Sequence, residues 1–145
     1  MIALASDHGG YRLKEEIKKF LEDSGYEVRD LGTGDEGAVD YPDYGHQAAR
    51  AVARGECQLG ILICGTGIGM SITANKVRGI RAALCHDSFS ARMSREHNDA
   101  SILCLGQRVV GTGLALEIVR VWLESSFAGG RHSRRVQKIE NYEKE

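Results

Sequence analysis

The chain has 145 residues, 42% of them hydrophobic, so it can bury one core but is too short for two ordinary domains. Its 19 lysines and arginines nearly balance 20 aspartates and glutamates, which disfavours nucleic acid and other strongly charged partners. The N-terminus lacks a basic leader, and no apolar run approaches the ~20 residues of a membrane span. We therefore expect one cytoplasmic domain over residues 1–145, with neither nucleic acid nor membrane as a partner.

Short apolar runs alternate with longer amphipathic segments, a pattern typical of a βα repeat with parallel strands. Strands are expected near residues 2–6, 27–31, 59–64, 80–85 and 101–105. The first helix has a 3.6-residue period that includes Leu13 and Ile17 and ends at Gly25. Further helices are expected from Pro42 to before Gly55 and over residues 68–76, 87–97 and 111–125.

The segment 111–125 is unusually apolar for a helix that covers one face of a sheet. Only a narrow polar stripe of Glu117, Arg120 and Glu124 interrupts its apolar residues. Burial against a second subunit and a deep position within one domain both explain this composition.

A thiol stands where a buried strand gives way to a glycine-rich turn, in Cys64-Gly65-Thr66-Gly67-Ile68-Gly69. Glycines let the backbone approach a ligand, and a helix starting at Ile68 would direct N–H groups and a positive dipole end at the same spot. A thiol there tends toward the thiolate, which acts as a base or nucleophile. The turn matches neither the dinucleotide fingerprint nor the P-loop, so it favours a small oxyanion over a nucleotide.

The four cysteines, Cys57, Cys64, Cys85 and Cys104, form no C-x-x-C pair and no cysteine–histidine knuckle. We therefore expect neither a structural metal nor a disulfide framework. A free cysteine in an apolar run is usually a small hydrophobe, and only Cys64 is followed by a loop that could activate it.

Two strand ends compete for the ligand crevice of a doubly wound sheet. The first strand ends in Asp7-His8-Gly9-Gly10, and the third ends in the Cys64 turn. In the common strand order these strands are neighbours, so a carboxylate, an imidazole, a thiol and backbone N–H groups would converge. Taken singly, Asp7 is better read as a helix cap and His8 as a surface histidine; together with Cys64 they indicate a site.

Two further segments have both a structural and a functional interpretation. His97-Asn98 falls at a helix C-terminus, where a histidine is often a favourable charge at the negative dipole end. Residues 129–138 contain four cationic side chains and no acid, which is usual for a solvated tail or helix face. Arg131 and Arg135 are four residues apart, however, and would share one helix face from which two guanidiniums could clamp a phosphate.

Several motifs together resemble ribose-5-phosphate isomerase type B, nearly from end to end and in the same order and spacing. They are Ala5 to Gly10, Asp40-Tyr41-Pro42, Cys64 to Ser71, Asn75-Lys76, Gly79 to Ala83, Glu96 to Ala100 and Gly129 to His132. The resemblance implies a three-layer α/β/α sandwich with a five-stranded parallel, flavodoxin-like sheet. It also implies an enzyme of the pentose phosphate pathway that interconverts ribose 5-phosphate and ribulose 5-phosphate without a cofactor or metal.

The resemblance also assigns roles to residues of this sequence. Cys64 would be the base that moves a proton between the first two carbons through an enediolate, and the glycine loop contains no carboxylate, which favours the cysteine branch of the family. The catalytic residues implied are Cys64, Thr66, Asp7 and His97. The substrate-binding residues implied are His8, Gly65, Gly67, Ile68, Gly69, Asn98, Arg108, Arg131 and Arg135.

The same resemblance implies a homodimer, or a dimer of such dimers, with sites made by both subunits and a basic tail over about 129–145 that packs on the partner. The family also contains isomerases of allose 6-phosphate and galactose 6-phosphate, so a six-carbon substrate is one alternative. A sugar-phosphate-binding module without turnover is another, although such a protein has no reason to place a thiol beside an oxyanion loop.

Overall fold

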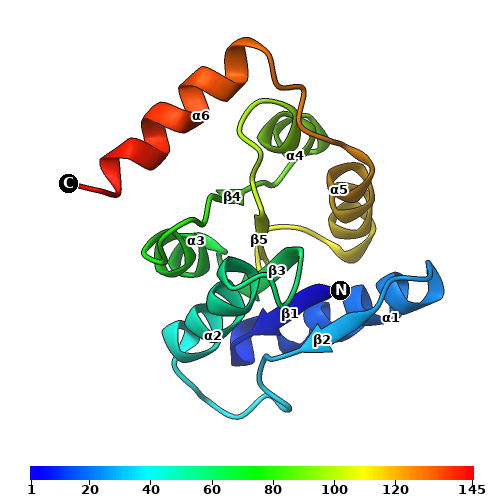
Figure 1. Ribbon diagram of the computed structural model, residues 1–145. Helices are drawn as coiled ribbons and strands as arrows, with labels where there is room; N and C mark the ends of the chain where they lie inside the picture. Colours follow the sequence, from blue (N-terminus) through cyan, green and yellow to red (C-terminus); the bar gives the residue numbers. More distant parts are fainter.

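Five short apolar segments pair side by side into one parallel sheet in the computed structural model, which describes residues 1–145 (Figure 1). The strands are β1 (Ile2–Ser6), β2 (Val28–Asp30), β3 (Leu59–Cys64), β4 (Ala82–Leu84) and β5 (Ile102–Gly106). All five lie where the sequence pattern predicts them, and their order in the sheet is β2-β1-β3-β5-β4.

Six helices accompany the strands, preceded by a short 3₁₀ helix, η1 (His8–Gly10). They are α1 (Tyr11–Asp23), α2 (Tyr41–Ala53), α3 (Ile68–Asn75), α4 (Ser88–Glu96), α5 (Thr112–Glu124) and α6 (Arg131–Tyr142). The first five agree closely with the predicted ranges. A membrane-spanning helix would need a longer apolar stretch than any of them contains.

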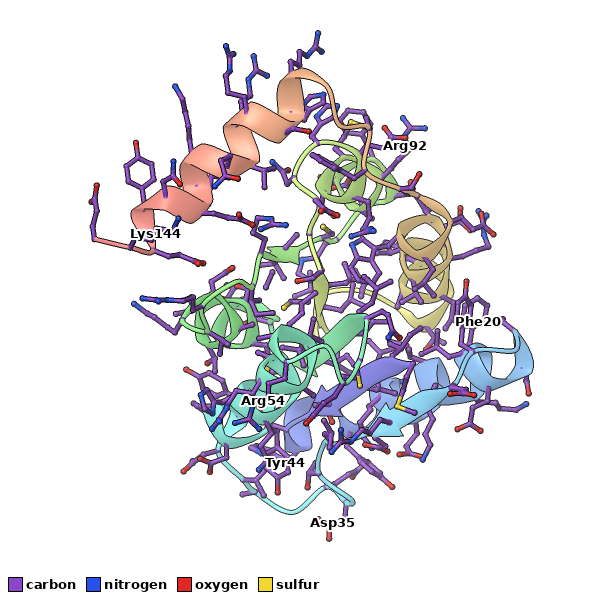
Figure 2. The ribbon with its side chains drawn as sticks, viewed as in Figure 1. Phe20, Asp35, Tyr44, Arg54, Arg92 and Lys144 are labelled. Carbon is purple, nitrogen blue, oxygen red and sulfur yellow. The ribbon has the colours of Figure 1, made fainter.

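Residues 129–145 were expected as a basic tail with Arg131 and Arg135 on one helix face, and α6 is a regular helix in this segment. It lies outside the sandwich, beside α4 and β4 (Figure 1). It buries a single side chain, Val136, and its other large apolar residues, Ile139 and Tyr142, remain exposed, so its short apolar stripe gives little indication of where the helix packs. Figure 2 shows nitrogen-tipped side chains projecting outward along this helix.

The two faces of the sheet pack against different helices because side chains alternate along each strand. Leu4, Ile61 and Ile63 point into a core covered by α1, α4 and α5. Ala3 and Leu62 point to the other face, which α2 and α3 cover. The result is the predicted three-layer α/β/α sandwich.

The strand order places β1 beside β3, as the site prediction requires. The chain winds to opposite sides of the sheet from this point, which makes the β1–β3 edge the place where ligands bind in such folds. At the far edge, β5 lies inside β4, whereas the flavodoxin order 2-1-3-4-5 has β5 outermost. The run of strands and helices along a sequence does not reveal this exchange.

Helix α5 packs within its own chain, between α1 and α4, which accounts for much of its apolar surface. Ala115, Ile118, Val119 and Trp122 are buried there. Leu114 remains 46% exposed. A deep position within one domain, rather than burial against a second subunit, therefore explains why these four residues are apolar.

Candidate active site

A cavity of about 400 Å³ opens at the carboxyl ends of β1 and β3. Nine residues from three stretches of the chain and the start of α2 line it: Asp7, Tyr41, Cys64, Gly65, Thr66, Ile68, Gly69, Ile72 and Arg108. The fold thus brings together the predicted acid, thiol, hydroxyl and one predicted phosphate-binding arginine.

The turn after β3 presents the Cys64 thiol at the N-terminus of α3. The Gly67 N–H donates a hydrogen bond to Cys64 Sγ at 3.1 Å, and the Ile68 N–H donates to Thr66 Oγ1 at 3.2 Å. Gly67 has φ +78°, and a β-carbon there would lie 2.8 Å from the Leu105 carbonyl carbon. Because both the φ and the close approach require glycine, this position fixes the shape of the turn. An amide donor and the positive helix end then surround the sulfur.

A second turn, after β5, supports the first one and carries Arg108. The Gln107 N–H donates to the Cys64 carbonyl at 2.9 Å, and the Arg108 N–H donates to the Gly65 carbonyl at 3.0 Å. The Arg108 guanidinium lies over Gly65, where a β-carbon would be 3.2 Å from Nη1. His86 holds the turn from behind, because its Nε2 accepts from the Gly106 N–H at 3.0 Å.

Asp7 and His8 both have structural roles, and of the two only Asp7 lines the cavity. Asp7 is 7% exposed, caps η1 by accepting from the Gly9 N–H at 2.9 Å, and still lines the cavity. His8 Nδ1 accepts from the Val39 N–H at 3.1 Å, which leaves Nε2 as the protonated nitrogen of the neutral ring. The capping interpretation and the site interpretation of Asp7 are therefore compatible.

The other thiols are buried in the core. Burial raises the pKa of Cys85 to about 11. Burial, followed by the proximity of Cys64 and Cys85, raises the pKa of the Cys104 thiol well above its ordinary value. Cys57 packs in the small-residue layer beneath α2. Cys64 is the one cysteine that lines a cavity among those described.

Four predicted site residues lie elsewhere: His97, Asn98, Arg131 and Arg135. His97 caps the C-terminus of α4, and its ring stacks on that of His132 with 4.2 Å between centroids. Arg131 and Arg135 belong to the same end of α6 as His132. Partial desolvation, followed by the charges of His97, Arg131 and Arg135, lowers the pKa of His132. His97, His132, Arg131 and Arg135 therefore form a second cluster, which the two arginines make cationic, and Asn98 follows His97 in the chain.

The parallel sheet keeps this cluster apart from Cys64 within one chain. His97 and Asn98 lie a few residues before β5 and so toward the amino ends of the strands. Cys64 ends β3 at the opposite, carboxyl edge. None of the four residues lines the cavity described above.

The structure also adds residues that were not predicted as site residues. Tyr41 lines the cavity, and its ring lies so close to Gly69 that a β-carbon on Gly69 would overlap it. Ile72 lines the cavity from the exposed side of α3. The motif Asp40-Tyr41-Pro42 could have indicated Tyr41, whereas nothing in the sequence distinguishes Ile72 from a core residue.

The fold and this cavity define an α/β protein with a thiol and an acid in a cavity at the switch point of a parallel sheet. The model of the family described as Ribose/Galactose Isomerase matches residues 2–139, and the chain belongs to that family.

Individual relatives are similar over almost their whole length. Ribose-5-phosphate isomerase B of Escherichia coli is 52% identical over 138 residues, covering 95% of this chain and 93% of the relative. D-erythrulose-4-phosphate isomerase of Pectobacterium atrosepticum is 46% identical, covering 98% and 94%. A solved structure of Clostridium thermocellum ribose-5-phosphate isomerase B is 62% identical with a TM-score of 0.98, covering 99% and 97%.

Proposed function

We propose that this protein is an aldose–ketose isomerase that interconverts ribose 5-phosphate and ribulose 5-phosphate, with Cys64 as the base. The observation that carries the proposal is the Cys64 thiol itself. Its sulfur lines the cavity, accepts the Gly67 N–H and sits at the start of α3, beside Asp7 and Thr66. The choice of ribose 5-phosphate as the substrate rests on the relatives that are named ribose-5-phosphate isomerase B.

The chemistry of isomerisation requires this combination of groups. A C–H bond beside a carbonyl is weakly acidic, so its proton needs a close base and the developing oxyanion needs donors. The Cys64 thiolate takes the proton from one carbon and returns it to the next. Thr66 and the amides of the loop from Gly65 to Gly69 stabilise the enediolate oxygen. Asp7 and His97 transfer protons to and from the sugar oxygens during ring opening, and Asn98 orients a hydroxyl.

The separation of the two clusters supports a shared site in a homodimer. In this proposal His97, Asn98, Arg131 and Arg135 of one chain complete the Cys64 cavity of its partner. The phosphate then meets Arg131 and Arg135 of one chain and Arg108 with His8 of the other. Residues 129–145, most of them in the exposed helix α6, are the part of the chain that would pack on the partner.

A sugar phosphate of another length is the second candidate. A relative 46% identical to this chain is named D-erythrulose-4-phosphate isomerase, and the family description includes galactose. These sugar phosphates and ribose 5-phosphate present the same kind of carbonyl and neighbouring C–H to Cys64. They differ in the distance from that carbonyl to the phosphate. Discrimination therefore depends on where the cationic side chains hold the phosphate relative to the thiol.

The direct test follows ketose absorbance while the purified protein is incubated with ribose 5-phosphate, allose 6-phosphate, galactose 6-phosphate or D-erythrulose 4-phosphate. We expect kcat/KM to be highest for ribose 5-phosphate. A higher value for another sugar phosphate would reassign the substrate within the same chemistry. Binding of all four without turnover would identify a binding module and reject the enzyme.

The nature of the base can be tested on the unmodified protein. A thiol-alkylating reagent should abolish turnover, and saturating ribose 5-phosphate should protect against it because Cys64 lies under the substrate. Exhaustive chelation should leave the rate unchanged, since the proposed proton transfer uses no electrophilic metal. Metal-dependent recovery of a chelated sample would contradict this mechanism.

A further inference from the structure

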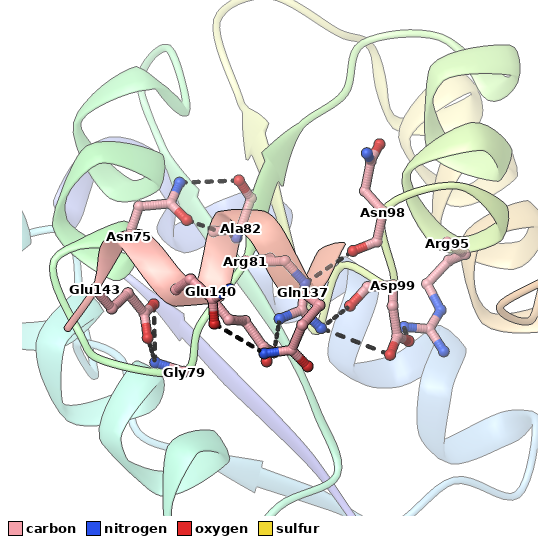
Figure 3. Close-up of polar contacts among 11 residues, drawn as sticks. Asn75, Gly79, Arg81, Ala82, Arg95, Asn98, Asp99, Gln137, Glu140 and Glu143 are labelled. Atoms are coloured by element: carbon pink, nitrogen blue, oxygen red, sulfur yellow. Dashed lines mark hydrogen bonds and ion pairs between the residues drawn. The ribbon is translucent and has the colours of Figure 1, made fainter. Parts of the chain in front are cut away.

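Arg81 connects two parts of the molecule that carry predicted site residues. It lies just before β4, and its side chain is 17% exposed (Figure 3). Its Nε donates to the Asn98 carbonyl at 2.8 Å and its Nη2 to the Asp99 carbonyl at 3.1 Å. Its Nη1 donates to Glu140 Oε1 at 2.6 Å. The first two acceptors belong to the turn after α4, and the third belongs to α6.

The turn after α4 has a backbone conformation that needs support. Asp99 has φ +47° and is the one non-glycine residue of the chain with a positive φ. Arg81 holds its carbonyl, and Arg95 Nη1 lies 3.4 Å from its Oδ1. Because His97 and Asn98 directly precede Asp99, the left-handed conformation of Asp99 sets how the segment that carries both residues is oriented relative to β5. Figure 3 shows the Asn98 side chain pointing away from Arg81.

Helix α6 has little apolar anchoring, so its orientation depends on polar contacts. Val136 is its single buried side chain. Toward the C-terminal end, Glu140 accepts from Arg81 and the Glu143 carboxylate accepts from a backbone N–H at 3.1 Å (Figure 3). The two predicted phosphate-binding arginines lie at the other end of the same helix. A helix moves as a rod, and a change at Glu140 therefore changes where those arginines point.

We propose that Arg81 is a positioning residue, which fixes the phosphate-binding arginines of α6 relative to His97 and Asn98. The inference rests on the proposed function and names a residue that serves it without touching the substrate. A guanidinium suits this place because its planar fork reaches acceptors in several directions at once. A lysine ammonium at position 81 would keep the charge but lose this geometry.

Two variants separate the two contacts of Arg81. Glu140→Gln weakens the contact with α6 and leaves the turn in place, so KM for ribose 5-phosphate and Ki for inorganic phosphate should each rise about tenfold at unchanged kcat. Arg81→Lys disturbs both contacts and should also lower kcat. Arg120→Gln is the matched control, because it breaks exposed pairs with Glu117 and Glu124 on α5, outside the site. The Arg120→Gln protein should keep the wild-type kcat, KM and Ki.

These readouts distinguish positioning from a merely structural role, which would reduce the folded fraction and lower apparent kcat without moving KM or Ki. If Arg81→Lys does not fold, Glu140→Gln alone decides, since Glu140 is 39% exposed on the outer helix. Unchanged KM and Ki in an active Glu140→Gln protein would overturn the inference.

A wild-type protein without turnover would instead reject the proposed function. Calorimetry with inorganic phosphate on the wild type and Glu140→Gln would then show whether the arginines depend on Arg81, and equal Kd values would again overturn the inference.

Discussion

The four cysteines differ in what their sulfur atoms contact more than in how deeply they are buried. All four are at most 5% exposed. Only Cys64 accepts a backbone N–H at a helix start and lines the cavity, whereas burial raises the pKa of Cys85 and Cys104. Burial alone would therefore have ranked Cys64 with the other three.

Replacement of Cys64 should separate catalysis from binding. We expect Cys64→Ala to lower kcat by about 10²–10⁴-fold with little change in substrate affinity, because the base acts in the transition state. The matched controls Cys57→Ala, Cys85→Ala and Cys104→Ala should keep most activity if they fold. Steady-state kinetics and direct binding measure both quantities. Equal losses in all four variants would mean that the thiols matter for packing.

Gly67 determines how the thiol is presented. Gly67→Ala combines an unfavourable positive φ with a β-carbon 2.6 Å from Leu84 and 2.8 Å from the Leu105 backbone. It should lower the free energy of unfolding by about 2 kcal/mol or more, and activity with it. Gly25→Ala controls for φ alone, since Gly25 has φ +88° with open space around it and should lose only about 1 kcal/mol. Equal urea midpoints for both variants would contradict the close packing of the turn.

At the scale of the elements, the turn after β5 depends on a neutral histidine. Burial lowers the pKa of His86, opposed by the nearby carboxylate of Asp87. The unfolded chain then binds a proton at a higher pH than the folded chain. Stability is therefore complete above the ordinary histidine pKa of about 6.5 and falls as the pH drops toward the lower folded value. Protonation also removes the lone pair that accepts the Gly106 N–H.

This linkage predicts a pH-dependent difference between the wild type and His86→Asn. Urea midpoints of the wild type should fall more steeply than those of His86→Asn between about pH 7 and about pH 5. His46→Asn, which removes an exposed histidine outside the proposed site, is the control. Parallel curves for the wild type and His86→Asn would show that His86 does not contribute to acid sensitivity.

At the scale of the whole molecule, the separation of the clusters predicts complementation between two inactive variants. If α6 completes the partner's cavity, Cys64→Ala and Arg131→Ala affect different chains of each site. A mixed dimer then has both lesions in one site and none in the other. Random pairing makes half of the dimers mixed, so refolding equal amounts together should recover about a quarter of wild-type activity.

The control for this experiment is a proof that mixed dimers formed, for example with chains of different mass in native mass spectrometry. Activity no greater than the sum of the separate variants, with mixed dimers present, would mean that Arg131 serves the site of its own chain or no site. Full activity of Arg131→Ala alone would remove it from phosphate binding altogether.

The sequence by itself determined the elements and one half of the candidate site. Period-2 and period-3.6 patterns are local, so they predicted the five strands and helices α1 to α5 close to their observed ranges. Asp7 and the Cys64 turn could also be predicted, because each is a short stretch of chain and the common strand order makes β1 and β3 neighbours. The structure shows both at one cavity.

Only the tertiary structure decided the exchange of β4 and β5, the separation of His97 from Cys64 and the course of α6. Each depends on contacts between residues far apart in the chain. Arg81 meets Glu140 across 59 positions, and α6 has too few apolar residues to indicate where it packs. Local patterns show which side chains an element must bury, and the relative placement of two elements is settled by long-range contacts that no local pattern records.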